Sequence, residues 1–264
     1  SSAASDVYKR QVYDPEAYEL YLKAKSLYAT SDNYEDSQRS MEMMLESVRS
    51  DDNLINAKLS LGQMYYEERK YEEANKLYSS ALSKSKSLSD NANLAETLRK
   101  QGMLYRKQKD IDTAIEKFND ILKRLPGDPV TLTSKGHALK TKGDGDEAIS
   151  SYRRAIHHHR SHGEAYYSLA NLKTYQFNSN EISSMQEMVK DSDLSFMDRV
   201  YLNFALGKGL EDSRNYAESF KYYQQGNLLK KSQSRYKAEQ MTQELQAQKE
   251  FCNADFFSRH KNVG

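Results

Sequence analysis

Small and apolar residues recur along the middle of the chain in a fixed order, and each group repeats the spacing of the group before it. In each complete group an alanine follows a glycine after 12 residues, and an aromatic residue follows the same glycine after 16. Apolar residues three or four positions apart lie on one face of a helix, so the pattern predicts helices in pairs. The groups are Ala57, Leu61, Gly62, Tyr65, Tyr71, Ala74, Tyr78, Ala81 and Leu82; Leu98, Gly102, Tyr105, Ile111, Ala114, Phe118, Ile121, Leu122 and Pro126; Leu132, Gly136, Leu139, Gly143, Ala148, Tyr152, Ala155 and Ile156; and Ala165, Tyr166, Leu169 and Ala170.

The length of the repeat indicates the kind of helical array. Gly102 and Gly136 are 34 residues apart, and so are Gly136 and Ala170. This period and pattern resemble the tetratricopeptide repeat (TPR), in which each unit is two antiparallel helices, A and B. The resemblance implies that the small residue on helix A lets a small residue on helix B approach closely. Because one hairpin leaves an apolar face in water, hairpins must stack, which implies an all-α superhelix (an α-solenoid) with a concave groove lined by A helices.

The predicted array covers residues 12–233, and its first and last hairpins are degenerate. Asp14 followed by Pro15 is a strong helix start, with Asp14 as the N-cap. Residues 178–180, Asn-Ser-Asn, are expected to cap a helix after the regular pattern breaks off near Phe177. About six hairpins are expected, near residues 15–51, 55–88, 95–126, 129–162, 163–190 and 198–231.

Both ends of the chain stand apart from the array. Residues 1–11, SSAASDVYKRQ, fit no helical period and resemble translated sequencing-adapter sequence, so we expect a non-native or disordered leader. Residues 234–264 are expected to form a capping helix and the start of a linker to a further domain. Ser234 would cap that helix, and its apolar stripe would cover the open end of the stack. The stripe consists of Tyr236, Met241, Leu245 and Phe251.

Charge and cysteine content narrow the classes of function. Lys+Arg number 39 and Asp+Glu 38, a net charge of +1, so no global field draws the chain to nucleic acid or membrane. The single cysteine, Cys252, cannot form an internal disulfide, and no run approaches the about 18 apolar residues that a membrane span needs. We therefore expect a cytoplasmic chain with a protein or peptide as its partner, without nucleic acid and without a membrane span.

Three stretches invite a chemical role, and each has a simpler interpretation. His158 and His162 are four residues apart and could share a helix face and bind a metal, but no cysteine or carboxylate cluster completes a site. Residues 143–145, Gly-Asp-Gly, lack the Lys-Ser/Thr of a phosphate loop and are typical of a turn between helices. Cys252 is better explained as a small apolar residue than as a nucleophile. We predict no catalytic, cofactor-binding or metal-binding residue, and no cofactor.

The repeat also predicts which helix A side chains face the groove. The middle of this set is basic, since Arg99, Arg106 and Lys140 come from consecutive repeats, and such a cluster would hold acidic side chains or a peptide carboxylate. Ordinary solvated charge is the alternative. Some TPR domains hold a chaperone C-terminus with Lys and Asn residues, but only Asn171 matches that pattern, so we do not predict that partner. The predicted groove residues are Leu59, Gln63, Tyr66, Arg99, Met103, Arg106, Thr133, His137, Lys140, Tyr167, Asn171 and Thr174.

Four stretches closely resemble, in the same order, those of bacterial TPR sulfotransferases. They are GDPVTLTSKGHALKTKGDGDEAISSYRRAI (127–156), GEAYYSLANLKTYQF (163–177), DRVYLNFALGKGLEDSRNYAESFKYYQQGN (198–227) and ADFFSRH (254–260). In that family a catalytic domain follows, and its Pro-Arg-Ser-Gly-Ser/Thr loop binds the phosphate of 3′-phosphoadenylyl sulfate. These 264 residues hold no such loop, so none of the family's cofactor-binding residues carries over.

The pattern and the resemblance together predict a non-catalytic TPR scaffold. The resemblance implies that it is the N-terminal arm of a bacterial sulfotransferase and positions a partner or an acceptor. The alternative is a stand-alone TPR adaptor in signalling or envelope assembly.

Overall fold

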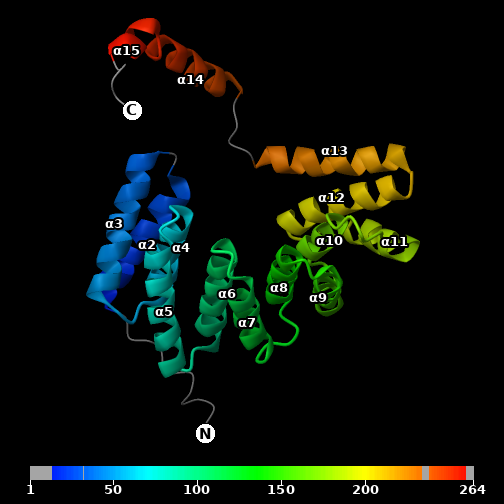
Figure 1. The fold of residues 1–264 in the computed structure, drawn as a ribbon, viewed down its shortest axis with the longest axis horizontal. Coiled ribbons are helices and arrows are strands. Elements are labelled where there is room, and N and C mark those ends of the chain that lie inside the picture. The colour runs from blue at the N-terminus through cyan, green and yellow to red at the C-terminus, as the bar shows by residue number, and fades with distance from the viewer. Residues whose placement is uncertain (1–13, 32, 234–237, 260–264) are drawn as a thin grey trace. The chain divides into compact units, whose positions relative to one another are not determined.

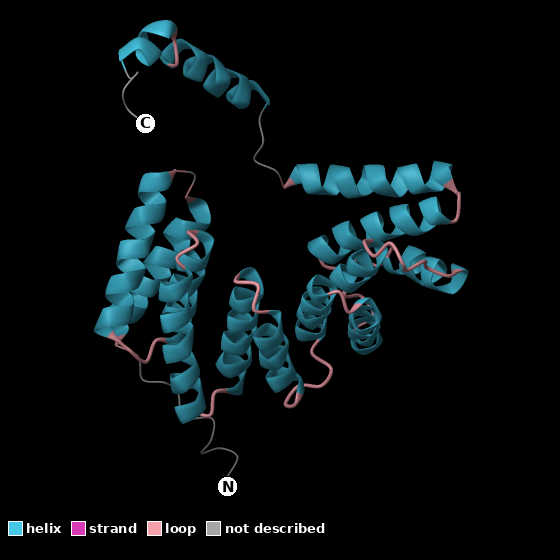
Figure 2. Ribbon diagram, viewed as in Figure 1, coloured by secondary structure: helices cyan, strands magenta, loops and turns pink. Residues whose placement is uncertain are grey.

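The computed structural model describes residues 14–31, 33–233 and 238–259, and within these ranges it holds helices and no strands (Figures 1 and 2). The predicted leader of residues 1–11, the predicted cap Ser234 and the stripe residue Tyr236 lie outside the described residues. The chain divides into two compact units, Ser1–Tyr175 and Gln176–Gly264. The prediction of an all-helical chain is confirmed.

In the first unit, the described residues form four successive helix pairs followed by a short helix (Figure 1). The two helices of each pair pack together, and consecutive pairs are joined through α3 and α4, α5 and α6, α7 and α8, and α9 and α10. The A helices α4, α6, α8 and α10 also touch in sequence, so they form a continuous row. The helices are α2 (Pro15–Thr30), α3 (Tyr34–Ser50), α4 (Ile55–Glu67), α5 (Tyr71–Ser87), α6 (Asn91–Lys107), α7 (Ile111–Leu122), α8 (Pro129–Lys142), α9 (Gly145–His158) and α10 (Gly163–Ala170).

The repeated glycines mark the closest approach of helix A to helix B. A Cβ added at Gly102 would lie 2.6 Å from Cε1 of Phe118, and Gly62 and Gly136 face Tyr78 and Tyr152 in the same way. The side chain nearest to each of these glycines is therefore an aromatic ring on helix B. A glycine at this position leaves room for the ring, which fills the space between the two helices.

Capping side chains explain where several helices begin. Asp14 accepts a hydrogen bond from the backbone N–H of Ala17, with Pro15 in the first turn, as predicted. Asp90, Asp110 and Asp128 cap α6, α7 and α8 in the same way.

The turn between helix A and helix B uses one left-handed residue in four of the pairs. Gly143 has φ of 100° and lies in the predicted turn between two helices, which ends at Asp144 because Gly145 begins α9. The corresponding residues Arg69, Lys109 and Arg214 have φ between 61° and 66°. A glycine is therefore not required at this turn, although each of the three non-glycine residues pays a conformational strain of about 1–2 kcal/mol for the left-handed backbone.

The second unit is built on one long hairpin, α12 (Phe196–Asp212) and α13 (Tyr216–Ser232), with α11 (Ser179–Met188) packed against α12. Asn178 caps α11 and exchanges hydrogen bonds with Glu181, which confirms the predicted cap. Phe177 is buried and its ring lies close to Gly209 of α12. The irregular run before this helix therefore supplies a packed aromatic residue.

Two predictions about this part of the chain stay open. The boundary between the units falls inside the predicted hairpin 163–190, with α10 in the first unit and α11 in the second. The predicted capping helix is present as α14 (Ala238–Phe251), followed by α15 (Ala254–Arg259). Its side chains Met241, Leu245 and Phe251 are 50%, 53% and 66% exposed. Whether this helix covers the end of the stack stays a prediction.

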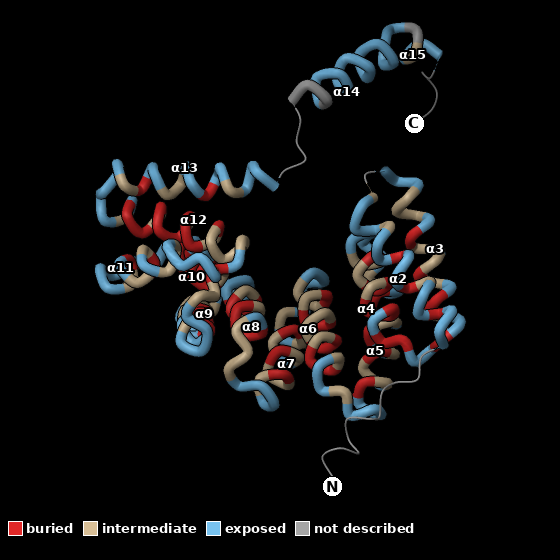
Figure 3. Tube along the Cα trace, turned by 180° about the vertical axis from the view of Figure 1, so that it is seen from behind, coloured by how far each residue is buried: buried red, intermediate tan, exposed pale blue. Residues whose placement is uncertain are grey.

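The buried residues lie between the packed helices (Figure 3). One cluster joins α2, α3 and α4, another joins α4, α5 and α6, and a third joins α6, α7 and α8. Each cluster is shared by consecutive pairs, as stacking requires. None of the described helices combines the length and the apolar character needed to span a membrane.

Candidate peptide-binding face

Ten of the twelve predicted groove residues lie on the row of A helices in the first unit, whereas Asn171 and Thr174 follow the end of α10 at Ala170 and so are not on a helix as predicted. We call the surface of these residues the A-helix face. Two of the twelve were predicted wrongly, because Leu59 and Thr133 are only 4% and 1% exposed. Leu59 packs in the core shared with α5, and the hydroxyl of Thr133 lies 3.0 Å from Nε2 of His162. The remaining ten comprise the half-buried Gln63, Tyr66, Arg99, Met103, Arg106 and His137 and the exposed Lys140, Tyr167, Asn171 and Thr174.

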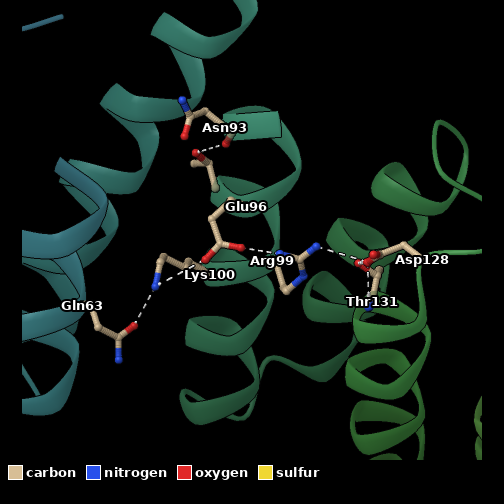
Figure 4. A network of polar contacts seen from close by, with 8 residues as sticks. Gln63, Asn93, Glu96, Arg99, Lys100, Asp128 and Thr131 are labelled. Atoms are coloured by element: carbon tan, nitrogen blue, oxygen red, sulfur yellow. Dashed lines mark hydrogen bonds and ion pairs between the residues drawn. The ribbon is translucent and has the colours of Figure 1, made fainter. Parts of the chain in front are cut away.

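A chain of polar contacts crosses this face from α4 to α8 (Figure 4). Lys100 donates to Oε1 of Gln63 at 3.1 Å and lies 3.6 Å from Oε1 of Glu96. Arg99 pairs with Glu96 through one guanidinium nitrogen and with Asp128 at 3.1 Å through the other. The network therefore links three successive repeats.

Asp128 serves two elements at once. Its carboxylate accepts from the backbone N–H of Thr131 at 2.9 Å, which caps α8, and it also accepts from Arg99 of α6. Burial alone would raise the pKa of Asp128, but the hydrogen bonds from Thr131 and the charge of Arg99 outweigh burial, so the pKa is lowered. Asp128 therefore stays ionised and holds Arg99 in place.

This pairing changes the predicted basic cluster. Arg99 is 17% exposed in its side chain and is neutralised by two carboxylates, so it is not free to bind an acidic partner. The sequence pattern did not reveal these partners because Asp128 lies 29 residues away in the next repeat. Glu96 lies three residues before Arg99 on the same helix, a spacing at which opposite charges meet, and this signal could have been used.

Arg106 differs from Arg99 in having no hydrogen-bond or ion-pair partner among the described residues. Its charge acts on titratable side chains of neighbouring repeats. Burial raises the pKa of Tyr66, while the nearby Arg106 cation opposes that rise. Burial likewise raises the pKa of Tyr152, again against the effect of Arg106. Arg106 is therefore a half-buried cation set between α4 and the α8–α9 pair.

His137 lies beside this cation and is uncharged at neutral pH. Burial, followed by the charges of Arg106 and Lys140, lowers its pKa to about 4. Its Nε2 lies 2.9 Å from the hydroxyl of Ser168, and its ring centroid is 5.6 Å from that of Tyr152. His137 thus contributes a hydrogen-bonding ring to the face and no charge.

Lys140 supplies the second cation. Its ammonium group donates to the backbone oxygen of Asn171 at 3.3 Å, and its side chain is exposed. The amide of Asn171 donates in turn to the backbone oxygen of Tyr167 at 2.9 Å. Two cations, Arg106 and Lys140, therefore remain available on the A-helix face.

The other predicted chemical candidates take structural positions. Helix α9 ends at His158, and His162 precedes α10, so the two histidines do not share a helix face, which was the arrangement that metal binding would have needed. His158 instead packs over Gly127. In the part of the chain that the structure describes, no group of three or more His, Cys, Asp or Glu side chains is placed to hold a metal ion.

Comparison with known proteins agrees with the repeat. Residues 53–126 and residues 133–172 each match a family model described as tetratricopeptide repeat. The chain therefore contains tetratricopeptide repeats and has the all-helical fold of an α-solenoid. Such repeats serve as protein-interaction scaffolds, and they are generally non-catalytic.

Solved structures share this fold at low sequence identity. Yeast Tom70 aligns over 94% of this chain and 51% of its own length, with 16% identity and a TM-score of 0.62. BtubC (BKLC) from P. vanneervenii aligns over 85% of this chain and 94% of its own, with 13% identity and a TM-score of 0.55. PilW, described as a type IV pilus biogenesis factor, aligns over 87% and 98%, with 16% identity and a TM-score of 0.54. At these identities the likeness concerns the fold alone.

No curated protein sequence matches this chain. None of the matches reported above points to a sulfotransferase-associated family. The association with a sulfotransferase therefore stays a prediction.

Proposed function

We propose that the A-helix face binds an acidic segment of a partner protein, with Arg106 and Lys140 as the cations that hold its carboxylates. The observation that carries this proposal is that Arg106 has no anionic partner among the described residues, although Arg99, two turns earlier on the same helix, has two. A half-buried cation without a partner is costly, and an incoming carboxylate would offset that cost through a charge-assisted hydrogen bond.

The neighbours of Arg106 suit a peptide rather than a free anion. Tyr66, Met103 and Tyr167 offer partly exposed apolar surface on three A helices, and Asn171 offers an amide. Apolar contact together with a few fixed polar groups is typical of peptide recognition.

The test is charge reversal at Arg106 with a matched control. Arg106→Glu is expected to weaken binding of a fluorescein-labelled oligoglutamate peptide by about tenfold, because an attraction becomes a repulsion. Arg153→Glu makes the same change at an exposed position on the B helix α9 and should leave affinity within about twofold. Fluorescence anisotropy measures both, and circular dichroism checks that helicity is unchanged. Equal binding by the wild type and Arg106→Glu, or equal binding of an oligoglutamine peptide, would contradict the proposal.

A second candidate places this scaffold as the N-terminal arm of a bacterial sulfotransferase. It is favoured by the four ordered stretches described above, from residue 127 to residue 260. Extending the coding sequence beyond Gly264 tests it. A strand followed by Pro-Arg-Ser-Gly would support the assignment, its absence would remove it, and a native stop codon directly after Gly264 would favour a stand-alone adaptor. A cytoplasmic location belongs to the same proposal and rests on the single cysteine.

A further inference from the structure

The loops that lead from a helix B to the next helix A carry exposed aliphatic side chains in the first unit. Leu88 follows α5, Leu125 follows α7, and Val130 lies in the first turn of α8; they are 43%, 47% and 42% exposed. Among the described residues of this unit, Leu22 of α2 is the one other leucine or valine with comparable exposure. The α5–α6 and α7–α8 loops lie at the same edge of the unit, the lower edge in Figure 1. Exposed aliphatic side chains are therefore concentrated at one edge.

Cations without an anionic partner lie at the same edge. Lys86, Arg124 and Arg154 are exposed, and none of the three forms an ion pair with another described residue. Nη1 of Arg124 lies 3.5 Å from Oδ1 of Asn91 at the start of α6, so the α7–α8 loop lies beside the end of the α5–α6 loop. Nη2 of Arg154 lies 3.4 Å from the backbone oxygen of Pro126. Helix α9 therefore adds its cation to the same pair of loops.

The acidic side chains nearest to these loops in the sequence are engaged in capping or pairing. Asp90 and Asp128 cap α6 and α8, and Asp128 also belongs to the network of Figure 4. Asp120 pairs with Lys123 at 2.8 Å. Residues 148–163 include three arginines and four histidines and no acidic residue. The edge therefore has a local surplus of positive charge, although the net charge of the whole chain is only +1.

An apolar pocket lies beside Leu125, between the start of α6 and the end of α7. Its volume is about 140 Å³. It can accept part of an aliphatic chain while the guanidinium group of Arg124 stays close to a negative charge on that chain. The pocket is lined mainly by Leu94, Leu98, Ile121, Leu125, Asn91 and Arg124.

We propose that this edge, formed by residues 86–90, residues 123–130 and Arg154, binds the surface of a membrane that contains anionic phospholipids. We call it the basic loop edge. Its cations contact the lipid phosphates, and Leu88 and Leu125 enter the boundary between the headgroups and the acyl chains. Because the loops of consecutive hairpins lie side by side, a flat surface can contact both of them at once.

Other anionic partners fit the basic loop edge less well. Residues 86–90 and 123–130 include no aromatic side chain on which a nucleic-acid base could stack. An acidic peptide would neutralise the cations, but it would leave the exposed leucines in water. The edge uses no residue of the A-helix face, so this inference does not depend on the function proposed above.

Vesicle sedimentation with the full chain tests the proposal. Vesicles of phosphatidylglycerol and phosphatidylcholine in equal parts should bind the chain about tenfold more strongly than vesicles of phosphatidylcholine alone, and added salt should weaken that binding. Phosphatidylcholine has no net charge, so the difference between the two vesicles measures the electrostatic contribution.

Charge reversal at the edge has a matched control on the same helix. Lys86→Glu should weaken binding to the mixed vesicles by about tenfold, because an attraction to the anionic surface becomes a repulsion. Lys76→Glu makes the same change at another exposed position of α5 and should leave binding within about twofold. Lys76 lies about 15 Å further along the helix, beyond the Debye length of about 10 Å at 0.1 M salt. Circular dichroism checks that both variants keep their helicity.

The aliphatic contact also has a matched control. Leu125→Ser should weaken binding to the mixed vesicles by about fivefold, because the insertion of its side chain is lost. Leu22→Ser removes a leucine of nearly the same exposure, 46%, from α2 and should change binding less than about twofold.

The remaining outcomes would overturn the proposal. Equal binding to the two kinds of vesicle, binding to neither, or equal losses within a matched pair of variants would each show that the basic loop edge does not bind an anionic membrane. If Lys86→Glu instead weakened binding of the labelled oligoglutamate peptide, the partner of this edge would be an acidic protein. Arg106→Glu should leave vesicle binding unchanged, which separates a failure of this proposal from a failure of peptide binding at the A-helix face.

Discussion

Single glycines decide how closely the two helices of a repeat pack. Gly62, Gly102, Gly136 and Gly207 each face an aromatic ring on the partner helix at a distance that leaves no room for a Cβ. The rings of Tyr78, Phe118 and Tyr152 are almost completely buried against them.

Gly102→Ala should destabilise the chain by about 1–3 kcal/mol, because the new methyl group would lie 2.6 Å from the ring of Phe118. On helix propensity alone, the same substitution would stabilise a helix by up to about 1 kcal/mol, so the sign of the effect separates the two causes. Gly145→Ala is the control, since nothing lies within 4 Å of a Cβ at that position. Urea unfolding measures both variants, and a Gly102→Ala chain as stable as the wild type would refute the close contact.

At the start of helix α8, one side chain both caps the helix and forms an ion pair with another repeat. Asp128 begins α8 and also anchors Arg99 of α6, so the start of one helix depends on the position of another. Asp110 caps α7 in an exposed position and forms no ion pair with another repeat in the described part of the chain. The two aspartates therefore separate the contribution of a cap from that of a link between repeats.

Asp128→Ala should cost about 2–4 kcal/mol, because it removes the cap and leaves the largely buried Arg99 with Glu96 alone. Asp128→Asn keeps a capping oxygen and removes the charge, so it should cost less than Asp128→Ala. Asp110→Ala should cost about 1 kcal/mol, the value of an ordinary cap. Chemical denaturation of the three variants gives the comparison, and equal losses for Asp128→Ala and Asp110→Ala would show that the contact with Arg99 contributes nothing.

For the whole molecule, stability is arranged along the chain in local pieces. Each core cluster joins consecutive helix pairs, and the two compact units each bury their own apolar residues. In such arrays the free energy of unfolding is close to the sum of the stability of each repeat and of the interfaces between neighbouring repeats. A destabilising substitution in one hairpin should therefore affect mainly that hairpin and its neighbours.

Gly207→Leu should raise amide hydrogen exchange in α12 and α13 and leave α4 to α7 unchanged, because the new side chain collides with Tyr223 in the second unit. Peptide-resolved mass spectrometry measures the exchange. Gly102→Ala is the reciprocal control, with its effect expected around α6 and α7. A uniform rise over the whole chain after either substitution would mean that the molecule unfolds as one cooperative body.

The periodicity of the sequence predicted most of the fold because it reports local physics. Helix pairs, their glycine positions and caps such as Asp14 and Asn178 depend on residues within one or two turns of each other. The pattern shows which residues are small, but it does not show which side chain lies nearest to each glycine.

The candidate site was predicted only in part. The sequence placed Arg99, Arg106 and Lys140 on one face, but it could not show which of these cations is paired with a carboxylate. Arg99 is neutralised from the next repeat by Asp128, His137 is kept neutral by burial beside two cations, and Arg106 is left without a counter-charge among the described residues. The sequence by itself determined that the chain is a helical repeat, since helix formation and pairing follow from nearby residues. Only the tertiary structure decided which cations remain free, since charge compensation depends on side chains that stacking brings together from separate repeats.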